Sequence, residues 1–158
     1  MRAGIGFDVH SFKTGRRLVL GGVEIEYHKG LNGHSDADVL VHAIMDALLG
    51  AAGLRDIGVY FPDTDTRYKN ISSLLLLKEV KKIINDRGFE IVNIDSTLIL
   101  ENPKVSAYIP EMLKKLSDAL ELDPGLIGIK ATTTEGLGFC GREEGIAAQS
   151  IALLETRL

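Results

Sequence analysis

The segment that most constrains the fold of this chain spans residues 34–50 and reads HSDADVLVHAIMDALLG. Apolar residues fill most of its positions, which predicts a helix that is buried on most sides. Asp38, His42 and Asp46 are nevertheless spaced one helical turn apart along it. A helix in a hydrophobic core has no structural need for a stripe of ionisable groups. The segment therefore predicts a core helix that also carries chemistry, with Ser35 as a capping residue near its start.

A second group of ionisable residues lies in the strand-like run that opens the chain. Asp8 and His10 are two residues apart there, so both side chains lie on the same face of the strand. Together with His42 they offer one oxygen and two nitrogen donors. Three protein ligands with an open fourth position are typical of catalytic Zn²⁺. We therefore favour a metal site formed by these three side chains.

Each of these residues also has an ordinary structural explanation. His10 could cap a loop, His42 could be a hydrogen-bonded histidine of the core, and Asp8 could simply end a strand. Asp46 has two equally weighted interpretations, as a carboxylate that orients a metal-bound imidazole or as part of a solvated helix face. The combination of donors, rather than any one residue, favours the metal site.

The remaining pattern predicts an α/β fold of the two-layer α+β type, formed as a single domain over residues 1–158. Strands are expected at 2–9, 90–100, 126–131 and 146–154, a hairpin at 18–26, and further helices at 72–87 and 110–122. The last of these strands could be a helix by its length, but its alternation favours a strand. This order of elements predicts a mixed sheet with helices packed mainly on one face.

Composition excludes several functional classes. The 18 basic and 22 acidic residues give a net charge of −4, without the clustered Lys and Arg that nucleic-acid binding needs. The single cysteine, Cys140, can form neither an internal disulfide nor a cysteine-based zinc cage, and we expect it to be a small buried residue. No secretory segment opens the sequence and no apolar run approaches a membrane span, so we expect a cytoplasmic protein.

Two polar loops are candidates for substrate contacts. Residues 56–66 are rich in turn formers, and residues 132–135, TTTE, follow a predicted strand. Threonine hydroxyls and backbone N–H groups suit phosphate, and Glu135 suits a hard cation. Alone, this second segment would be better explained as a polar turn. A P-loop motif is absent and Gly4-Ile5-Gly6 is an isolated G-x-G, so neither common nucleotide-binding loop is expected.

A series of short motifs runs along essentially the whole chain. They are GIGFDVH at 4–10, LGG at 20–22, HSD at 34–36, DALLG at 46–50, DIG at 56–58, FPDTD at 61–65, KATTTE at 130–135 and GR at 141–142. In this order they closely resemble the 2-C-methyl-D-erythritol 2,4-cyclodiphosphate synthase family of the non-mevalonate isoprenoid pathway. The chain departs from the family at Ala37, where Gly is frequent, and at Cys140, where Thr is common. Neither is a position to which the resemblance assigns a function.

The resemblance implies a homotrimer whose active sites lie between subunits, each combining the zinc site of one chain with the cytidine pocket of its neighbour. It implies Asp8, His10 and His42 as ligands of one Zn²⁺ per subunit, and Glu135 as a ligand of Mg²⁺ or Mn²⁺ held with the substrate diphosphate. It implies His34 and Thr133 as catalytic residues that stabilise the transition state. The substrate-binding residues that it implies are Asp8, His10, His34, Ser35, Asp56, Gly58, Phe61, Asp63, Asp65, Leu100, Pro103, Lys104, Ser106, Ala131, Thr132, Thr133, Glu135, Phe139 and Arg142.

The implied reaction is an intramolecular phosphate attack. The 2-phosphate of 4-diphosphocytidyl-2-C-methyl-D-erythritol 2-phosphate attacks the β-phosphorus of the same molecule, which releases CMP and closes a cyclic diphosphate. A polyanion must fold onto itself, so charge neutralisation and orientation should carry the catalysis. The attacking phosphate is already ionised and needs no general base. The alternatives are a zinc-dependent phosphohydrolase and a non-catalytic trimer that binds metal or isoprenoids.

Overall fold

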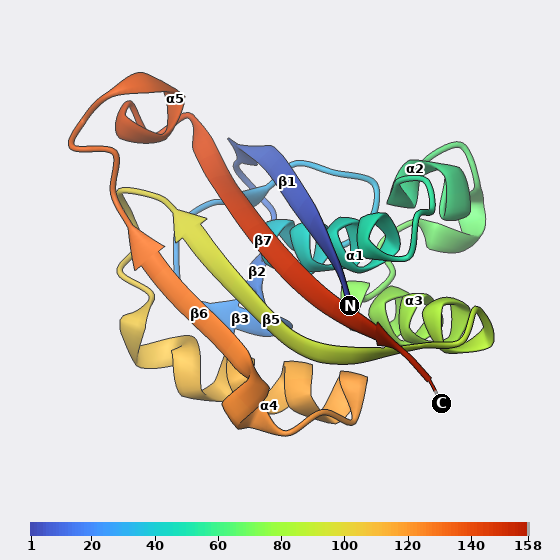
Figure 1. Cartoon of the computed structure of the whole chain (residues 1–158). Coiled ribbons are helices and arrows are strands. Elements are labelled where there is room, and N and C mark those ends of the chain that lie inside the picture. Colours follow the sequence, from blue (N-terminus) through green and yellow to red (C-terminus); the bar gives the residue numbers. More distant parts are fainter. Residues whose placement is uncertain (158) are drawn as a thin grey trace.

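The computed structural model describes residues 1–157, in which one mixed sheet has the strand order β4-β1-β7-β5-β6 (Figure 1). Strands β1 and β5 both pair antiparallel with β7, and β5 pairs parallel with β6. Strands β1, β5 and β6 therefore run in the same direction and bring their carboxyl ends to one end of the sheet. Their bounds are β1 (Arg2–Lys13), β4 (Gly30–Leu31), β5 (Phe89–Ile99), β6 (Ile127–Thr132) and β7 (Gly145–Thr156).

The predicted fold class is confirmed, because α1 (Val39–Ala51), α3 (Ser73–Asp86) and α4 (Ile109–Leu120) cover one face of this sheet (Figure 1). Short helices α2 (Ile57–Tyr60) and α5 (Gly138–Gly141) and the 3₁₀ turns η1 (Thr66–Tyr68), η2 (Ser106–Tyr108) and η3 (Pro124–Leu126) complete the helical structure of the described residues. Over residues 1–157, no helix is long and apolar enough to cross a membrane.

Most predicted elements occur where the sequence places them, with small shifts at their ends. The segment 146–154 is a strand, as favoured, and the amphipathic pattern of 72–87 corresponds to α3. Strand β1 continues to Lys13, beyond its predicted end at residue 9. The hairpin consists of β2 (Leu18–Leu20) and β3 (Val23–Ile25), and it turns at Gly21 and Gly22, whose φ angles are 58° and 74°. Positive φ angles at both positions explain the paired glycines.

The start of α1 differs from the prediction, because Asp38 rather than Ser35 is its N-cap. The carboxylate of Asp38 accepts hydrogen bonds from the backbone N–H groups of Val41 at 3.1 Å, Gly21 at 3.0 Å and Gly22 at 2.7 Å. Burial and the nearby charge of Asp36 raise the pKa of Asp38 to about 6, against the opposing effect of the three N–H donors. The buried carboxylate thus fastens the β2–β3 hairpin to the start of α1.

Candidate metal centre and active site

A close contact between β1 and α1 brings the predicted metal ligands together. A Cβ atom on Gly6 would lie 1.9 Å from the carbonyl oxygen of Ala43, and one on Gly4 would lie 2.1 Å from that of Ala47. Only glycine permits α1 to approach the strand backbone so closely. The isolated G-x-G is therefore a site of helix–strand packing, and it brings His42 on α1 to the part of β1 that carries Asp8 and His10.

Asp8, His10 and His42 form a compact group of potential metal donors, as the sequence predicts. Atom Oδ2 of Asp8 lies 2.9 Å from Nε2 of His10 and 3.1 Å from Nδ1 of His42. The two imidazole nitrogens are 3.2 Å apart. His42 is 8% exposed, whereas Asp8 and His10 are half-buried, so the group is open on one side.

The donor set fits a tetrahedral zinc ion. Donors at the Zn–N distance of about 2.0–2.1 Å lie ~3.3 Å from one another around a tetrahedral centre, close to the three separations in this group. Two imidazoles and one carboxylate would leave a fourth position open around such an ion. Three protein ligands with an open position are typical of catalytic rather than structural zinc sites.

The electrostatics of the group keep Asp8 ionised. Burial alone would raise the pKa of Asp8, but in the metal-free chain the close contacts and electrostatic interactions with the His10 and His42 imidazoles lower it to about 2. For His10, burial opposes the charged form, yet the bond to Asp8 and the charge of Asp8 raise the pKa above its ordinary value. A carboxylate that is ionised at neutral pH is the form that binds a metal ion.

Further hydrogen bonds orient the two imidazoles. Nδ1–H of His10 donates to the carbonyl oxygen of Asn32 at 2.7 Å, which leaves Nε2 facing the other donors. Nε2 of His42 lies 3.0 Å from Oγ of Ser73 and 3.2 Å from Oγ of Ser35. Asp46 does not act as an orienting carboxylate, which was one of its two interpretations, because its Oδ1 accepts from the backbone N–H of Ile57 at 2.8 Å. It holds the start of α2 instead.

A cavity of about 370 Å³ opens beside the metal centre. Its predicted lining residues are His10, His34, Ser35, His42, Gly58, Phe61 and Asp63, and it also includes Gly33, Ile57, Tyr68 and Leu76. Asp56 and Asp65, also predicted, flank this group. Asp56 is the N-cap residue of α2, and the carbonyl oxygen of Asp65 accepts from Nε2–H of His34 at 3.0 Å. The structure thus collects most of the predicted residues of 34–65 around one cavity.

Arg16 forms hydrogen bonds to the backbone of the loop that carries His34 and Ser35. The Arg16 guanidinium donates from NH1 to the carbonyl oxygen of Gly33 at 2.6 Å and from NH2 to that of Ser35 at 2.7 Å. The backbone N–H of Asn70 donates to the carbonyl oxygen of His34 at 2.9 Å. These bonds fix the loop on both sides of His34.

A second cavity, of about 230 Å³, lies where β5 and β6 end. It is lined by Leu100, Pro103, Lys104, Ser106, Ala131 and Thr132, for which the resemblance implies cytidine binding, together with Thr133, Glu101 and Val105. Strands β7 and β5 lie between β1 and β6, which separates the outer two by roughly 14 Å at the usual strand spacing. The metal centre and this cavity are therefore distinct sites on one chain.

The loop after β6 is organised by Glu101, which the sequence did not single out. Its carboxylate accepts from the backbone N–H groups of Thr134 at 3.0 Å and Gly136 at 3.4 Å, and these bonds hold the pKa of Glu101 below its usual range. Glu135 is exposed, has a φ angle of 54°, and its N–H donates to Oγ1 of Thr133 at 3.2 Å. Glu135 is not a member of the donor group around Asp8.

Phe139 and Arg142, the last predicted site residues, belong to α5 and its end. Phe139 is 42% exposed, and Arg142 pairs with Glu144 at 2.9 Å. Helix α5 lies beyond the carboxyl ends of β5 and β6, at the end of the sheet that carries the second cavity (Figure 1). Cys140, between Phe139 and Arg142 in the sequence, is buried as expected.

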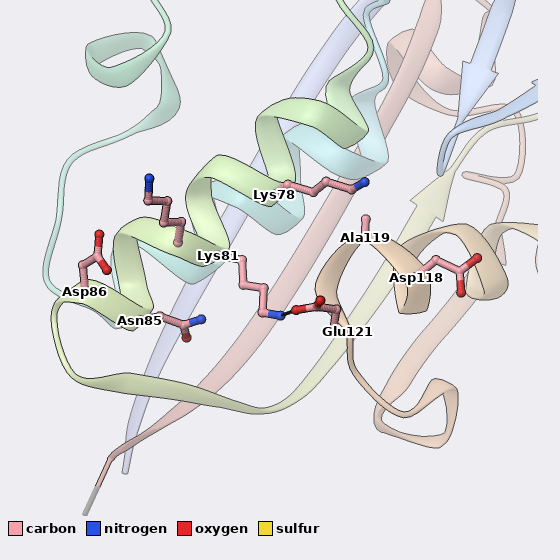
Figure 2. Close-up of a pocket in the computed structure, with 8 residues that line it drawn as sticks. Lys78, Lys81, Asn85, Asp86, Asp118, Ala119 and Glu121 are labelled. Carbon is pink, nitrogen blue, oxygen red and sulfur yellow. Dashed lines mark hydrogen bonds and ion pairs between the residues drawn. The ribbon is translucent and has the colours of Figure 1, made fainter.

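Figure 2 shows a further groove, between α3 and α4, that no predicted site residue lines. It is lined by three lysines and three carboxylates, Lys78, Lys81, Lys82, Asp86, Asp118 and Glu121, with Asn85 and Ala119. Lys81 bonds to Glu121 across it. Its charges balance, so the groove has no evident preference for an anion or a cation.

Several residues that shape the site could not be recognised from their spacing within a predicted helix or strand. Arg16, Asp36, Ser73 and Glu101 act through contacts between segments far apart in the chain, and spacing within one helix or strand cannot reveal such contacts. The isolated G-x-G of Gly4 and Gly6 indicates close packing of β1 against α1 rather than a ligand-binding loop.

Comparison with known proteins gives consistent matches over the full length of the chain. The YgbB family matches residues 1–155. A 2-C-methyl-D-erythritol 2,4-cyclodiphosphate synthase of Clostridium acetobutylicum is 64% identical over 154 residues, which cover 98% of this chain and 99% of that protein.

Solved structures agree with these matches. A structure of 2C-methyl-D-erythritol-2,4-cyclodiphosphate synthase in a CDP-bound form is 36% identical, with a TM-score of 0.89, and the match covers 98% of this chain and 100% of that one. The IspF–CDP complex of Plasmodium falciparum is 32% identical, with a TM-score of 0.87 and coverage of 99% and 97%. By its sequence and its fold, this chain belongs to the YgbB family.

Proposed function

We propose that this protein converts 4-diphosphocytidyl-2-C-methyl-D-erythritol 2-phosphate to 2-C-methyl-D-erythritol 2,4-cyclodiphosphate and CMP. The observation that carries the proposal is the donor group of Asp8, His10 and His42 at the edge of a cavity that His34 and Ser35 also line. The 64% identical relative bears the name of this synthase. The new bond joins an oxygen of the 2-phosphate to the β-phosphorus, and the bond from that phosphorus to the CMP oxygen breaks.

The metal that fits the donor group is Zn²⁺, bound by Asp8, His10 and His42. When bound, it supplies a Lewis acid that draws charge from a phosphate oxygen and orients it. The chain's own residues hold the donors in place: His10 is fixed by Asn32, and His42 lies on a helix pressed against β1. Water is an unwanted nucleophile in a cyclisation, and the rings of Phe61 and Tyr68, which line the cavity in contact with each other, would limit its access.

His34 and Thr133 would stabilise the transition state. The bond from Nε2–H of His34 to the Asp65 carbonyl oxygen fixes the imidazole, while Thr133 lines the second cavity and orders the backbone of Glu135. Glu135 would hold Mg²⁺ or Mn²⁺ with the substrate diphosphate, because a carboxylate suits a hard cation. The methylerythritol phosphate end would lie among Ser35, Asp56, Gly58, Phe61, Asp63 and Asp65.

The cytidine end would lie in the second cavity, among Leu100, Pro103, Lys104, Ser106, Ala131 and Thr132. Phe139 and Arg142 would lie near the substrate and the trimer axis. Support comes from the position of this cavity, at the carboxyl ends of β5 and β6. Two related structures are described as CDP-bound. Lys104 and Arg142 carry positive charge that suits a substrate with several phosphates.

We also propose that residues 1–158 act as a single catalytic domain within a homotrimer, with each active site between two subunits. The open face of the sheet supports this assembly, because Ile5, Phe7, Val9 and Ile151 are 62%, 57%, 38% and 52% exposed on adjacent strands β1 and β7. An apolar patch of this kind is typical of a protein interface. The two cavities lie apart on one chain, so a substrate bound at the metal centre would place its cytidine end in the pocket of a neighbouring subunit.

Release of CMP tests this proposal. Purified protein with Zn²⁺ and Mg²⁺ is incubated with the substrate, and CMP is quantified by chromatography beside a His42→Ala control. We expect multiple turnovers for the wild type and at least a hundredfold loss for the variant. A wild type that binds zinc yet releases no CMP would instead support a non-catalytic trimer that binds metal or isoprenoids.

A further inference from the structure

We propose that Ser73 and Asp36 form a hydrogen-bond chain that fixes the His42 imidazole in the tautomer and orientation of a metal ligand. The inference rests on the proposed metal centre and concerns two residues outside the predicted site. Neither would touch the ion, so both are positioning residues that act through His42. Ser73 is the first residue of α3 and Asp36 lies in the loop before α1, so the chain links distant segments.

The contacts of Ser73 are compact and fully buried. Its Oγ lies 3.0 Å from Nε2 of His42, and the side chain has no exposure to solvent. The same hydroxyl donates to Oδ1 of Asp36, and the backbone N–H of Ser73 donates to Oδ2 at 2.9 Å. One carboxylate therefore holds both the hydroxyl and the first backbone N–H of α3.

The Asp36 carboxylate determines which atom carries the proton in each hydrogen bond from Asp36 through Ser73 to His42. An ionised Asp36 can only accept, so the Ser73 hydroxyl proton points at Asp36. Oγ of Ser73 can then only accept a hydrogen bond from His42. Nε2 of His42 must therefore carry the imidazole proton and donate it to Ser73. This tautomer leaves Nδ1 of His42 as a bare lone pair, directed at Asp8 and His10. Metal-bound imidazoles depend on such a partner for their second nitrogen.

Two other candidates for this task fit less well. Oγ of Ser35 lies 3.2 Å from Nε2 of His42, but it also accepts from the backbone N–H of Ala37 at 3.3 Å and has no carboxylate behind it. Asp46 is one turn along α1 from His42, but its carboxylate is bonded to the backbone of Ile57. Among the partners of Nε2 within residues 1–157, only Ser73 is hydrogen-bonded to a carboxylate.

The role of Ser73 in positioning His42 can be tested separately from its role in folding. Replacement of Ser73 by alanine removes the hydroxyl that joins His42 to Asp36, yet keeps the backbone N–H that bonds to Asp36 and anchors α3. The neighbouring Ser72 offers a matched control, because it is exposed, precedes the same helix, and makes no side-chain cap bond.

The test measures zinc affinity of Ser73→Ala and Ser72→Ala by competition with a chromogenic chelator. We expect Ser73→Ala to bind zinc about 10-fold to 100-fold more weakly, the range found when such outer partners are removed. Ser72→Ala should stay within about twofold of the wild type, as most surface substitutions do. In ¹H–¹⁵N spectra of the zinc-loaded protein, the Nε2–H of His42 should be protected from exchange in the wild type and not in Ser73→Ala.

Asp36→Asn provides a second variant should Ser73→Ala fail to fold. It keeps an oxygen that can accept from Ser73 but removes the charge, so a smaller loss of about threefold to tenfold is expected. Unchanged zinc affinity and a protected Nε2–H in the Ser73 or Asp36 variant would overturn the inference. A wild type that takes up no zinc, or a His42→Ala variant that binds it equally well, would overturn the proposed metal centre itself.

Discussion

Gly6 of β1 lies directly against Ala43 of α1, so closely that a Cβ atom on Gly6 would be 1.9 Å from the Ala43 carbonyl oxygen. This contact sets the distance between the strand that carries Asp8 and His10 and the helix that carries His42. The metal centre therefore depends on two residues without functional groups. Its geometry is a consequence of packing, as for most sites built between two rigid elements.

Gly6→Ala should consequently damage metal binding as well as stability. The added methyl must push α1 away from β1, and such overpacking costs about 1–3 kcal/mol or more. We expect a lower melting temperature and less than one zinc per chain by elemental analysis. Gly50→Ala is the matched control, since Gly50 lies in α1 and a Cβ atom on it would lie 3.9 Å from the carbonyl oxygen of Ile5. It should keep its zinc, and a Gly6→Ala protein with full zinc and unchanged stability would contradict the account.

Arg16→Ala should weaken turnover without loss of zinc. The guanidinium bonds to two carbonyl oxygens of the loop around His34, and each charged bond contributes about 1.5–3 kcal/mol where it is shielded from water. We expect kcat/KM to fall roughly 10-fold to 100-fold. Arg17→Ala controls for the loss of one positive charge, because Arg17 is 80% exposed and pairs only loosely with Glu24 at 3.6 Å. Equal effects of the two variants would mean that Arg16 does not position the loop.

Glu135→Gln should alter the response to Mg²⁺ and leave zinc in place. Loss of one charged ligand should raise the Mg²⁺ concentration for half-maximal activity by about tenfold. Zinc content is measured in the same preparation, and Glu143→Gln is a nearby exposed carboxylate for comparison. If Glu135→Gln loses zinc together with activity, Glu135 has been assigned to the wrong ion.

Acid should destabilise the metal-free protein through Asp8. Its pKa is about 2 in the folded chain and 3.8 in the reference state, so the folded form binds fewer protons between these values. The stabilisation is complete above about pH 4 and is lost as the pH falls toward 2, a change of about 2 kcal/mol. Urea unfolding in a chelator at fixed protein concentration should show the advantage of the wild type over Asp8→Asn shrink by this amount across that range. A pH-independent difference would contradict the pKa shift.

Local pattern in the sequence predicts most of the fold. The 3.6-residue spacing of α3 and the paired glycines of the β2–β3 turn are properties of single segments, and both are found as predicted. The predicted start of α1 was wrong. The capping signal at Ser35 is local, whereas Asp38 also accepts hydrogen bonds from N–H groups of a distant hairpin. Ala37 explains part of that error: its φ angle of 58° breaks the helix after Ser35.

In the candidate site, too, the features set by local pattern could be predicted and the contacts between distant segments could not. Asp8, His10 and His42 could be grouped from sequence because a strand and a helix each impose a spacing, and the structure brings all three together. The roles of Asp38 and Asp46 could not be predicted, since their partners lie at Gly21, Gly22 and Ile57. Contacts of this kind exist only after the elements pack.

The identity of the phosphorus products tests the proposed reaction most directly. The substrate is incubated with the zinc- and magnesium-loaded protein, and the products are followed by ³¹P NMR. We expect two coupled resonances of a cyclic diphosphate, with CMP formed in equal amount. Linear phosphates without a cyclic product would contradict the proposed reaction and would identify the protein as a zinc-dependent phosphohydrolase.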